Sequence, residues 1–228
     1  MAGREFWTST GITIDFMQSI FFKLFGISFK VYVAHASIMN MVLTLSTFFI
    51  LKKFELSNFY SFFYSIILAV TSYPLSGTPF LDHHAIMFCI FAIYCFILAI
   101  KFNNDIYWFF VPFLIILAFF SKQTPSAYVG FSLGFLILVY FYSNFSLRPF
   151  INIIFSSILS LILFFLLILI SEVKIIDLYN QYISYPSYIG EIRMSAEGFL
   201  IPFEFSRYFL KFKFIHLAYF FLLFYLIN

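Results

Sequence analysis

The sequence predicts an all-α protein, a bundle of helices that crosses a membrane several times. Three observations point to this class. Of the 228 residues, 63% are hydrophobic and only 10% are charged, whereas a soluble domain is about 45–50% apolar and about 25% charged. The mean hydropathy is +1.00. The apolar residues also come in long runs, and a helix needs about 17–25 of them to cross a bilayer. A soluble globular domain and a disordered chain are both excluded.

The apolar runs predict a six-span bundle over residues 31–170. In chain order, the runs cover residues 31–51, 59–75, 85–100, 106–120, 127–142 and 150–170. The first ends at the pair Lys52–Lys53, the second near Pro74 and Gly77, and the third at the polar segment 101–105. The fourth and fifth are short and are joined by a polar link at residues 121–126, and the sixth is the most hydrophobic.

The remaining segments are more polar. Residues 1–30 include an apolar stretch, 16–25, that contains Gln18 and Lys23, so we expect it to lie in the membrane interface as a juxtamembrane amphipathic helix. Residues 171–213 are predicted to form a polar loop. Tyrosines recur there every third residue and predict an amphipathic surface helix that is interrupted at a proline; these are Tyr179, Tyr182, Tyr185 and Tyr188, with Pro186. Their rings favour an interfacial aromatic belt over the alternative, a platform that stacks on a sugar.

Residues 214–228 begin a seventh span. Because the chain starts without a leading span and ends within one, we expect it to be a piece of a longer protein.

Lysine and arginine in short loops set the orientation of a membrane protein. If residues 1–30 lie outside, the inside loops carry Lys52, Lys53, Lys101 and Arg148, and the short outside loops carry only Lys122. This orientation also gathers most carboxylates outside: Glu5, Asp15, Asp82, Glu172, Asp177, Glu191, Glu197 and Glu204, against Glu55 and Asp105 inside. Most side chains capable of chemistry are therefore predicted to lie on one membrane face.

Several functional classes find no support. A formal charge of +3, scattered along the chain, does not indicate nucleic-acid binding. Cys89 and Cys95 lie in one apolar run and are interpreted as small buried hydrophobes. The chain has no phosphate-binding glycine-rich loop, metalloprotease helix or nucleophile elbow. Charges within the spans are nearly absent, which argues against an ion pump.

The sequence Asp82-His83-His84, before the third span, is the first candidate for chemistry. A carboxylate beside two imidazoles suits a general base, a divalent metal site or a phosphate-binding cluster. Successive helical residues point about 100° apart, so only two of the three side chains can face one ligand. The alternative is a helix N-cap by Asp82, with the histidines among lipid headgroups.

Other candidates lie along the predicted outside face. Lys122, with Gln123 beside it, can meet an anionic phosphate or simply extend its ammonium to the interface. Arg193 and Arg207 in the polar loop are either phosphate ligands or interfacial arginines. Asp15 and Glu5 belong to a segment that is either a site or a solvated tail. His35 and Asn40, within the first span, are interpreted as hydrogen-bonded packing residues.

Taken in order, these motifs form a familiar series. An acidic segment leads into the amphipathic stretch that ends at residues 23–26, and a span with Lys52–Lys53 behind it follows. Residues 77–84 then read Gly-x-Pro-x-x-Asp-His-His, and residues 121–125 read Ser-Lys-Gln-x-Pro. This series resembles the GT-C glycosyltransferase superfamily, in particular the bacterial relatives of the dolichyl-phosphate-mannose protein mannosyltransferases. The resemblance covers most of residues 3–150.

The resemblance implies an integral protein of the bacterial inner membrane that moves a sugar from a polyprenyl-phosphate carrier to a glycan, lipid or protein hydroxyl on the extracytoplasmic face, with inversion. Such enzymes place a catalytic acid in the first outside loop. Here Glu5 stands at the matching place, in Arg4-Glu5-Phe6, and Asp15 is the nearby aspartate, so the base assignment stays open between them. Asp82 is the third catalytic candidate. A divalent cation is the one cofactor that is compatible with this mechanism.

The family also has a span before this loop and several more after the last one here. Two alternatives therefore stand beside the transferase. One is a non-enzymatic flippase or transporter subunit for a lipid-linked sugar, and the other is an inactive gene fragment.

Overall fold

The computed structural model describes residues 11–73, 77–170 and 174–197 of the chain, and these residues form helices joined by short turns. The chain divides into two compact units, residues 1–181 and 182–228. The first contains the helices α1 to α8: α1 (Ile12–Phe25), α2 (Phe29–Lys53), α3 (Asn58–Ser72), α4 (Leu81–Phe102), α5 (Asp105–Ser121), α6 (Gln123–Ser143), α7 (Leu147–Ile170) and α8 (Ile175–Tyr179). A π-helical turn, η1 (Asn180–Ser184), crosses the boundary, and α9 (Tyr185–Glu197) belongs to the second unit.

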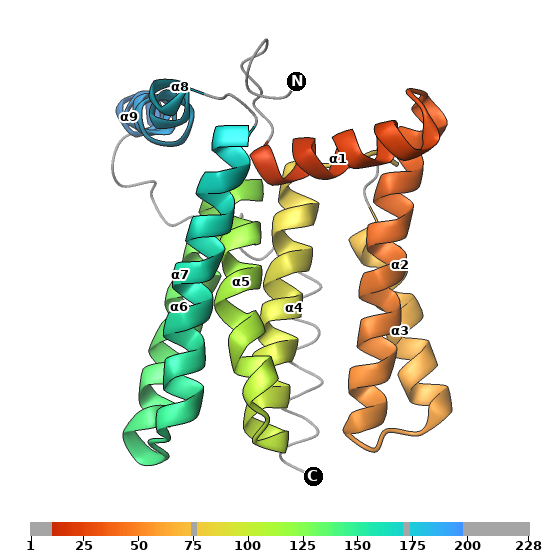
Figure 1. The fold of residues 1–228 in the computed structure, drawn as a ribbon. Helices are drawn as coiled ribbons and strands as arrows, with labels where there is room; N and C mark the ends of the chain where they lie inside the picture. The colour runs from red at the N-terminus through yellow and green to blue at the C-terminus, as the bar shows by residue number, and fades with distance from the viewer. Residues whose placement is uncertain (1–10, 74–76, 171–173, 198–228) are drawn as a thin grey trace. The chain divides into compact units, whose positions relative to one another are not determined.

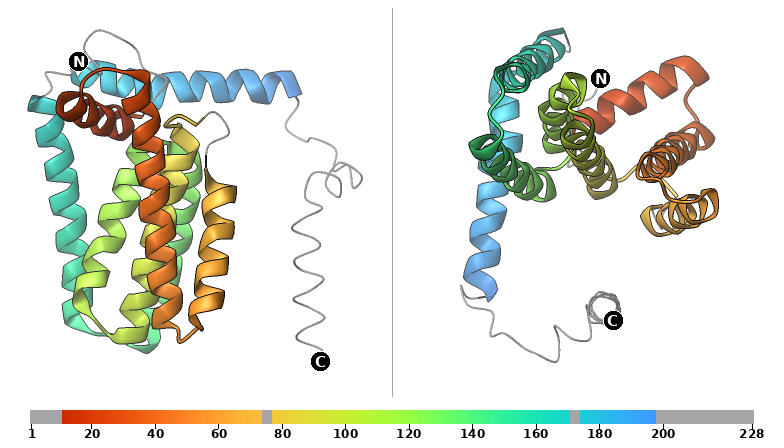
Figure 2. Two further views of the ribbon diagram at one scale, coloured as in Figure 1. Left: turned by 90° about the vertical axis from the view of Figure 1, so that its right-hand side faces the viewer. Right: turned by 90° about the horizontal axis from the view of Figure 1, so that it is seen from below.

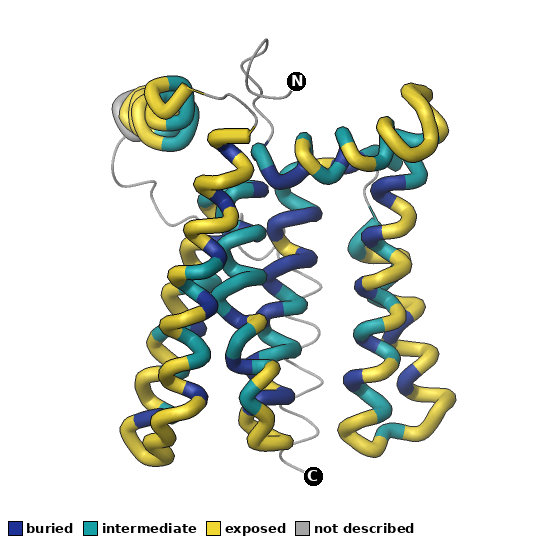
Figure 3. Tube along the Cα trace, viewed as in Figure 1, coloured by how far each residue is buried: buried dark blue, intermediate teal, exposed yellow. Residues whose placement is uncertain are grey.

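Four helices, α2, α4, α6 and α7, are long and apolar enough to cross a membrane. The helices α3 and α5 are apolar as well, but they have 15 and 17 residues. All six lie side by side in antiparallel succession, which puts the N-termini of α2, α4 and α6 at the same end (Figure 1). Outward-facing side chains of α2, α3, α6 and α7 include many exposed aliphatic and aromatic residues, as expected of surfaces that contact lipid (Figure 3).

The centre of the bundle is the pair α4–α5, which form the most extensive contact between helices. The helix α4 is buried along much of its length, with Ala85, Ala92 and Ala99 at 0% exposure (Figure 3). These small residues recur every seven positions and so line one face of the helix, where they allow close approach. On one side of the pair α7 and α6 pack against α5, and on the other the pair α2–α3 meets α4 (Figure 2).

Serine and asparagine side chains join neighbouring helices. Asn40 in α2 donates to the Ala69 carbonyl oxygen at 3.0 Å and accepts from the Ser72 hydroxyl at 2.8 Å, both in α3. Ser156 in α7 donates to the carbonyl oxygen of Phe109 in α5. Asn40 thus acts as the packing residue that the sequence predicted, since polar groups in apolar surroundings are retained where they find partners.

The helix α1 lies across one end of the bundle, roughly perpendicular to the spans (Figures 1 and 2). It contains the stretch 16–25 for which an amphipathic helix was predicted. It ends at Gly26, whose φ of 83° is a backbone conformation that favours glycine, and the chain then turns into α2. We call this end of the bundle the α1 end. We call the opposite end, where Lys52, Lys53, Lys101 and Arg148 lie at helix termini, the lysine end.

Two segments depart from the prediction. The predicted polar loop 171–213 is helical from Ile175 to Glu197, and Pro186 lies within this continuous helical run, directly after the π-helical turn η1. A proline removes one hydrogen bond to the preceding turn, and the regular α-helical pattern changes to the wider π-helical turn at this place. The predicted start of a seventh span, 214–228, lies outside the described residues.

Candidate functional site

An ion pair at the α1 end joins the two motifs that the sequence singled out. Lys122 Nζ lies 2.5 Å from Asp82 Oδ1, and the two side chains are 38% and 35% exposed. Asp82 stands in the first turn of α4, and Lys122 is the single extended residue between α5 and α6. The ammonium is therefore held by a carboxylate forty residues away in sequence, yet it stays partly exposed.

The link that carries Lys122 is tighter than the sequence predicted. Instead of a polar link over residues 121–126, only Lys122 leaves helical geometry, with φ −155° and ψ 130°. The helix α6 then begins at Gln123, and Pro125 fits in its first turn because the amides there have no carbonyl partners within the helix. This abrupt break fixes the place from which the lysine side chain extends.

The N-cap alternative for Asp82 is wrong. The N-cap residue of α4 is Phe80, without a side-chain cap, and Asp82 lies two positions inside the helix. A carboxylate in the first turn still benefits from the positive end of the helix dipole. Its side chain bonds to Lys122 rather than to the backbone amides ahead of it.

The three residues of the Asp-His-His motif point to three different surroundings, as their angular spacing requires. Asp82 meets Lys122. His83 packs edge-on against the ring of Phe80, with centroids 5.7 Å apart. His84 is buried, at 1% exposure, and faces His35 in α2. The motif is thus a junction between helices rather than a single ligand cluster.

A row of hydrogen bonds connects α1, α2 and α4 beneath this surface. Gln18 Oε1 lies 2.8 Å from His35 Nδ1, His35 Nε2 lies 3.2 Å from His84 Nε2, and His84 Nδ1 lies 3.1 Å from the Phe80 carbonyl oxygen. Gln18 and both histidines are buried, and the ring of Phe21 stacks on His35 at 4.7 Å. Side chains that are far apart in sequence therefore join α1 to α2 and α4.

The protons of this row can be placed from its partners. The carbonyl of Phe80 requires His84 Nδ1 to donate, so a neutral His84 accepts at Nε2 from His35 Nε2. His35 Nδ1 is then an acceptor and needs a donor from Gln18. The amide of Gln18 supplies one when its NH2 group faces the imidazole, which also gives a partner to a nitrogen that is otherwise buried without one. In each hydrogen bond of the row the donor then lies on the Gln18 side and the acceptor on the Phe80 side. All the groups are neutral, so no net charge is buried.

The N-terminus of α1 packs directly against the backbone of the α5–α6 junction. A Cβ placed on Gly11 would lie 2.0 Å from the carbonyl oxygen of Ser121 and 2.4 Å from that of Phe120. Gly11, Asp15 and Gln18 follow one another at helical spacings of four and three, so they share one face of α1. Asp15, which is half-buried, lies on this face between the contact with Ser121 and the contact with His35.

The other candidates are less closely placed. Gln123 is the first residue of α6, next to Lys122, and is half-buried. Arg193 belongs to α9 in the second unit, and its side chain is not among those described. Glu5 and Arg207 lie outside the described residues. The described part of the site therefore consists of Asp15, Asp82 and Lys122, with the histidine row beside them.

Sequence reasoning missed Gln18 and Gly11 as parts of this region, whereas His35 is the hydrogen-bonded packing residue that the sequence predicted. Gln18 was noted only as a polar residue too costly for a span, yet such a residue on an apolar helix marks a buried partner. In the part of the chain that the structure describes, no group of three or more His, Cys, Asp or Glu is arranged to hold a metal ion.

Comparisons of this chain with protein-family models, with curated proteins and with solved structures give no match.

Proposed function

We propose that this chain is a membrane glycosyltransferase that moves a sugar from a polyprenyl-phosphate carrier to an acceptor hydroxyl, with inversion, at the α1 end. The observation that supports it best is the ion pair of Asp82 and Lys122, which brings together the two motifs of the resemblance at the end where α1 carries Asp15. The proposal includes six crossings, α3 and α5 among them, so that the α1 end is extracytoplasmic and the lysine end cytoplasmic.

Lys122 is proposed to bind the phosphate of the donor. The leaving group of this reaction is a phosphate anion, so it needs positive charge rather than a proton. A lysine ammonium acts as a point charge with three donors, and its pairing with Asp82 leaves it partly exposed at the helix break. Asp82 then positions the ammonium. When the phosphate arrives, the ammonium either leaves the Asp82 carboxylate or binds both anions.

The proton acceptor is proposed to be Asp15 or Glu5. The acceptor hydroxyl loses a proton as its oxygen attacks the anomeric carbon, and a carboxylate within hydrogen-bond reach takes that proton. Asp15 lies on the face of α1 that contacts the bundle, at the same end as the pair of Asp82 and Lys122. A carrier lipid reaches this end from the side, because the donor phosphate travels at the membrane surface.

The test uses the full chain in proteoliposomes with a polyprenyl-phosphate hexose that is radiolabelled in the sugar, together with a membrane extract as the source of acceptors. If Asp15 is the base, Asp15→Asn lowers turnover by about 10²–10⁴-fold with little change in the KM for the donor. If Glu5 is the base, Glu5→Gln does so instead. Lys122→Gln and Asp82→Asn raise the KM for the donor. Lys30→Gln, which removes an equal charge at the same end of the bundle, leaves both parameters unchanged.

The same assay distinguishes a transferase from the rival class, a flippase or transporter subunit. Label that crosses the bilayer while still attached to its carrier indicates a flippase or transporter subunit. Turnover that is undiminished in the Asp15, Glu5 and Asp82 variants removes the carboxylates from the mechanism. Absence of transfer by the unaltered chain contradicts the proposal as it stands.

A further inference from the structure

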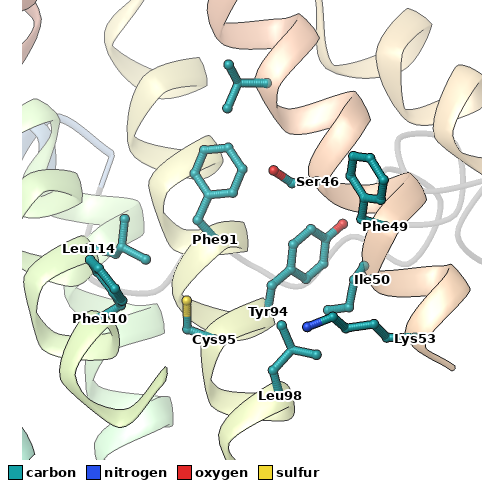
Figure 4. A pocket seen from close by; sticks show the side chains of 11 residues that line it. Ser46, Phe49, Ile50, Lys53, Phe91, Tyr94, Cys95, Leu98, Phe110 and Leu114 are labelled. Atoms are coloured by element: carbon teal, nitrogen blue, oxygen red, sulfur yellow. The ribbon is translucent and has the colours of Figure 1, made fainter. Parts of the chain in front are cut away.

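A cavity of about 400 Å³ lies between α2, α4 and α5, toward the lysine end. Its walls are almost entirely apolar and include Phe49 of α2, Phe91 of α4 and Phe110 of α5 (Figure 4). Ser46 and Tyr94 are among its few polar residues, and the Tyr94 hydroxyl is bonded to Thr47 at 2.8 Å. The cavity is open on one side, so it is a groove between three apolar helices, of which α2 and α4 are long and apolar enough to cross a membrane.

Lys53 is the charged residue in the lining of this groove. Its side chain reaches from α2 toward α4 (Figure 4). Its ammonium donates to the hydroxyl of Tyr107 in α5 at 2.8 Å and lies over the ring of Phe102 at 5.3 Å. Lys101 lies beside it, because its Nζ donates to the Lys53 carbonyl oxygen at 2.9 Å. Two ammonium groups therefore gather where the groove meets the lysine end.

These ammonium groups retain N–H donors with which they can bind an anion. Each has three N–H donors, and each is seen to use one of them on an uncharged oxygen. Within the described residues, neither lysine forms an ion pair with a carboxylate, unlike Lys122. Two cations at the end of an apolar groove form a site that is complementary to one anionic group attached to one apolar chain.

The depth of the groove identifies the kind of chain. Its lining in α2 extends from Val42 to Lys53, which is about 16 Å of helix at 1.5 Å per residue. One leaflet of the hydrocarbon core is about 15 Å deep, half of the usual 30 Å. The groove therefore extends from a headgroup position to about mid-membrane, which matches one phospholipid acyl chain.

We propose that this groove binds one acyl chain of an anionic phospholipid, whose phosphate lies against the ammonium groups of Lys53 and Lys101. The site is at the opposite end of the bundle from Asp82 and Lys122, so it does not rest on the transferase proposal. Anionic lipids are enriched in the cytoplasmic leaflet, where the lysine end is predicted to lie. The lipid fills the gap between the α2–α3 pair and the α4–α5 centre, and so supports a contact that protein side chains leave incomplete.

The test measures lipid binding to the full chain in detergent by native mass spectrometry, with competing dioleoyl phosphatidylglycerol and dioleoyl phosphatidylcholine. We expect one phosphatidylglycerol to bind at least fivefold more tightly than phosphatidylcholine. A lysine near a lipid headgroup changes affinity about fivefold, so Lys53→Gln with Lys101→Gln should reduce the preference to near one. Lys53→Arg with Lys101→Arg should keep it. Lys30→Gln, at the far end of α2, should leave it unchanged.

A second variant keeps the charges and fills the groove. Ser46→Phe places a ring among the lining residues, so it should lower the affinity for both phospholipids while circular dichroism shows an unchanged helix content. Equal affinity of the unaltered chain for the two phospholipids overturns the proposal. So does a loss of preference in Lys30→Gln as large as that in the lysine pair. Displacement of phosphatidylglycerol by a tenfold lower concentration of undecaprenyl phosphate would assign the groove to an isoprenoid carrier instead.

Discussion

At the scale of residues, the molecule is organised by a few buried polar side chains. Gln18, His35 and His84 form a row in which each group satisfies its neighbour. A hydrogen bond between membrane helices contributes about 0.6 kcal/mol on average, with values up to about 1.7. Removing one member costs more than that, because the remaining buried partner loses its bond and cannot reach water. The main effect of the row is therefore to fix the positions of α1, α2 and α4 relative to one another. Its contribution to the free energy of unfolding is the smaller effect.

We expect His35→Leu to lower the free energy of unfolding by about 1–3 kcal/mol, because the amide of Gln18 and the Nε2 of His84 both lose the bond to His35. The double replacement of His35 and His84 by leucine should cost less than the sum of the two single changes, since one orphaned group is then removed. Thermal or denaturant unfolding in detergent measures both. His83→Leu is the control and should have a smaller effect. Strictly additive costs would contradict a direct contact between the two histidines.

The pair of Asp82 and Lys122 makes a different prediction, because both side chains are more than one-third exposed. Exposed ion pairs contribute about 0–1 kcal/mol, so Lys122→Asp should lower stability only slightly by placing two carboxylates together. The exchange Asp82→Lys with Lys122→Asp should restore that stability. It should not restore donor binding, because the ammonium then extends from α4 instead of the helix break. Recovery of both properties would show that the position of the lysine is unimportant.

At the scale of elements, hydropathy predicted the six helices of the bundle because each apolar run needs its backbone hydrogen bonds satisfied internally. The same physics explains the errors at the ends. α4 begins at Leu81 and α6 at Gln123, earlier than the apolar runs, because polar residues such as Asp82 and Gln123 continue a helix beyond its apolar part. Hydropathy does not determine how each helix is rotated about its axis. It therefore could not predict the contacts of Lys122 with Asp82 and of His35 with His84.

The docking of α1 on the bundle rests on Gly11. Gly11→Ala would place a Cβ 2.0 Å from the Ser121 carbonyl oxygen, and backbone cannot move aside as a flexible side chain can. We expect a loss of at least about 1–3 kcal/mol and faster proteolysis of the N-terminal segment, as overpacking predicts. Gly134→Ala in α6 is the matched control, since nothing lies within 4 Å of its added Cβ. Equal resistance of both variants to protease would contradict the close packing of α1.

At the scale of the whole chain, the arrangement separates two chemistries at opposite ends of one bundle. The α1 end carries the ion pair of Asp82 and Lys122 and the histidine row, whereas the lysine end carries cations and aromatic rings around an apolar groove. The chemistry of both ends depends on whether the 15-residue α3 and the 17-residue α5 cross the membrane. If α3 did not cross, the two ends could not face opposite sides of the membrane.

Labelling of single cysteines in intact cells with a membrane-impermeant maleimide decides this point, in a background where Cys89 and Cys95 are replaced by alanine. Lys23→Cys and Thr124→Cys probe exposed positions at the α1 end, and Glu55→Cys and Ser146→Cys probe the lysine end. We expect the first two to react and the last two to react only after the cells are opened, because lysine and arginine favour the cytoplasmic side. Reaction of Glu55→Cys together with Lys23→Cys would show that α2 does not cross. Protection of Thr124→Cys with labelling of Lys23→Cys would show that an odd number of crossings separates α1 from α6. Asp15 and Lys122 would then lie on opposite membrane faces, which would contradict the proposed site.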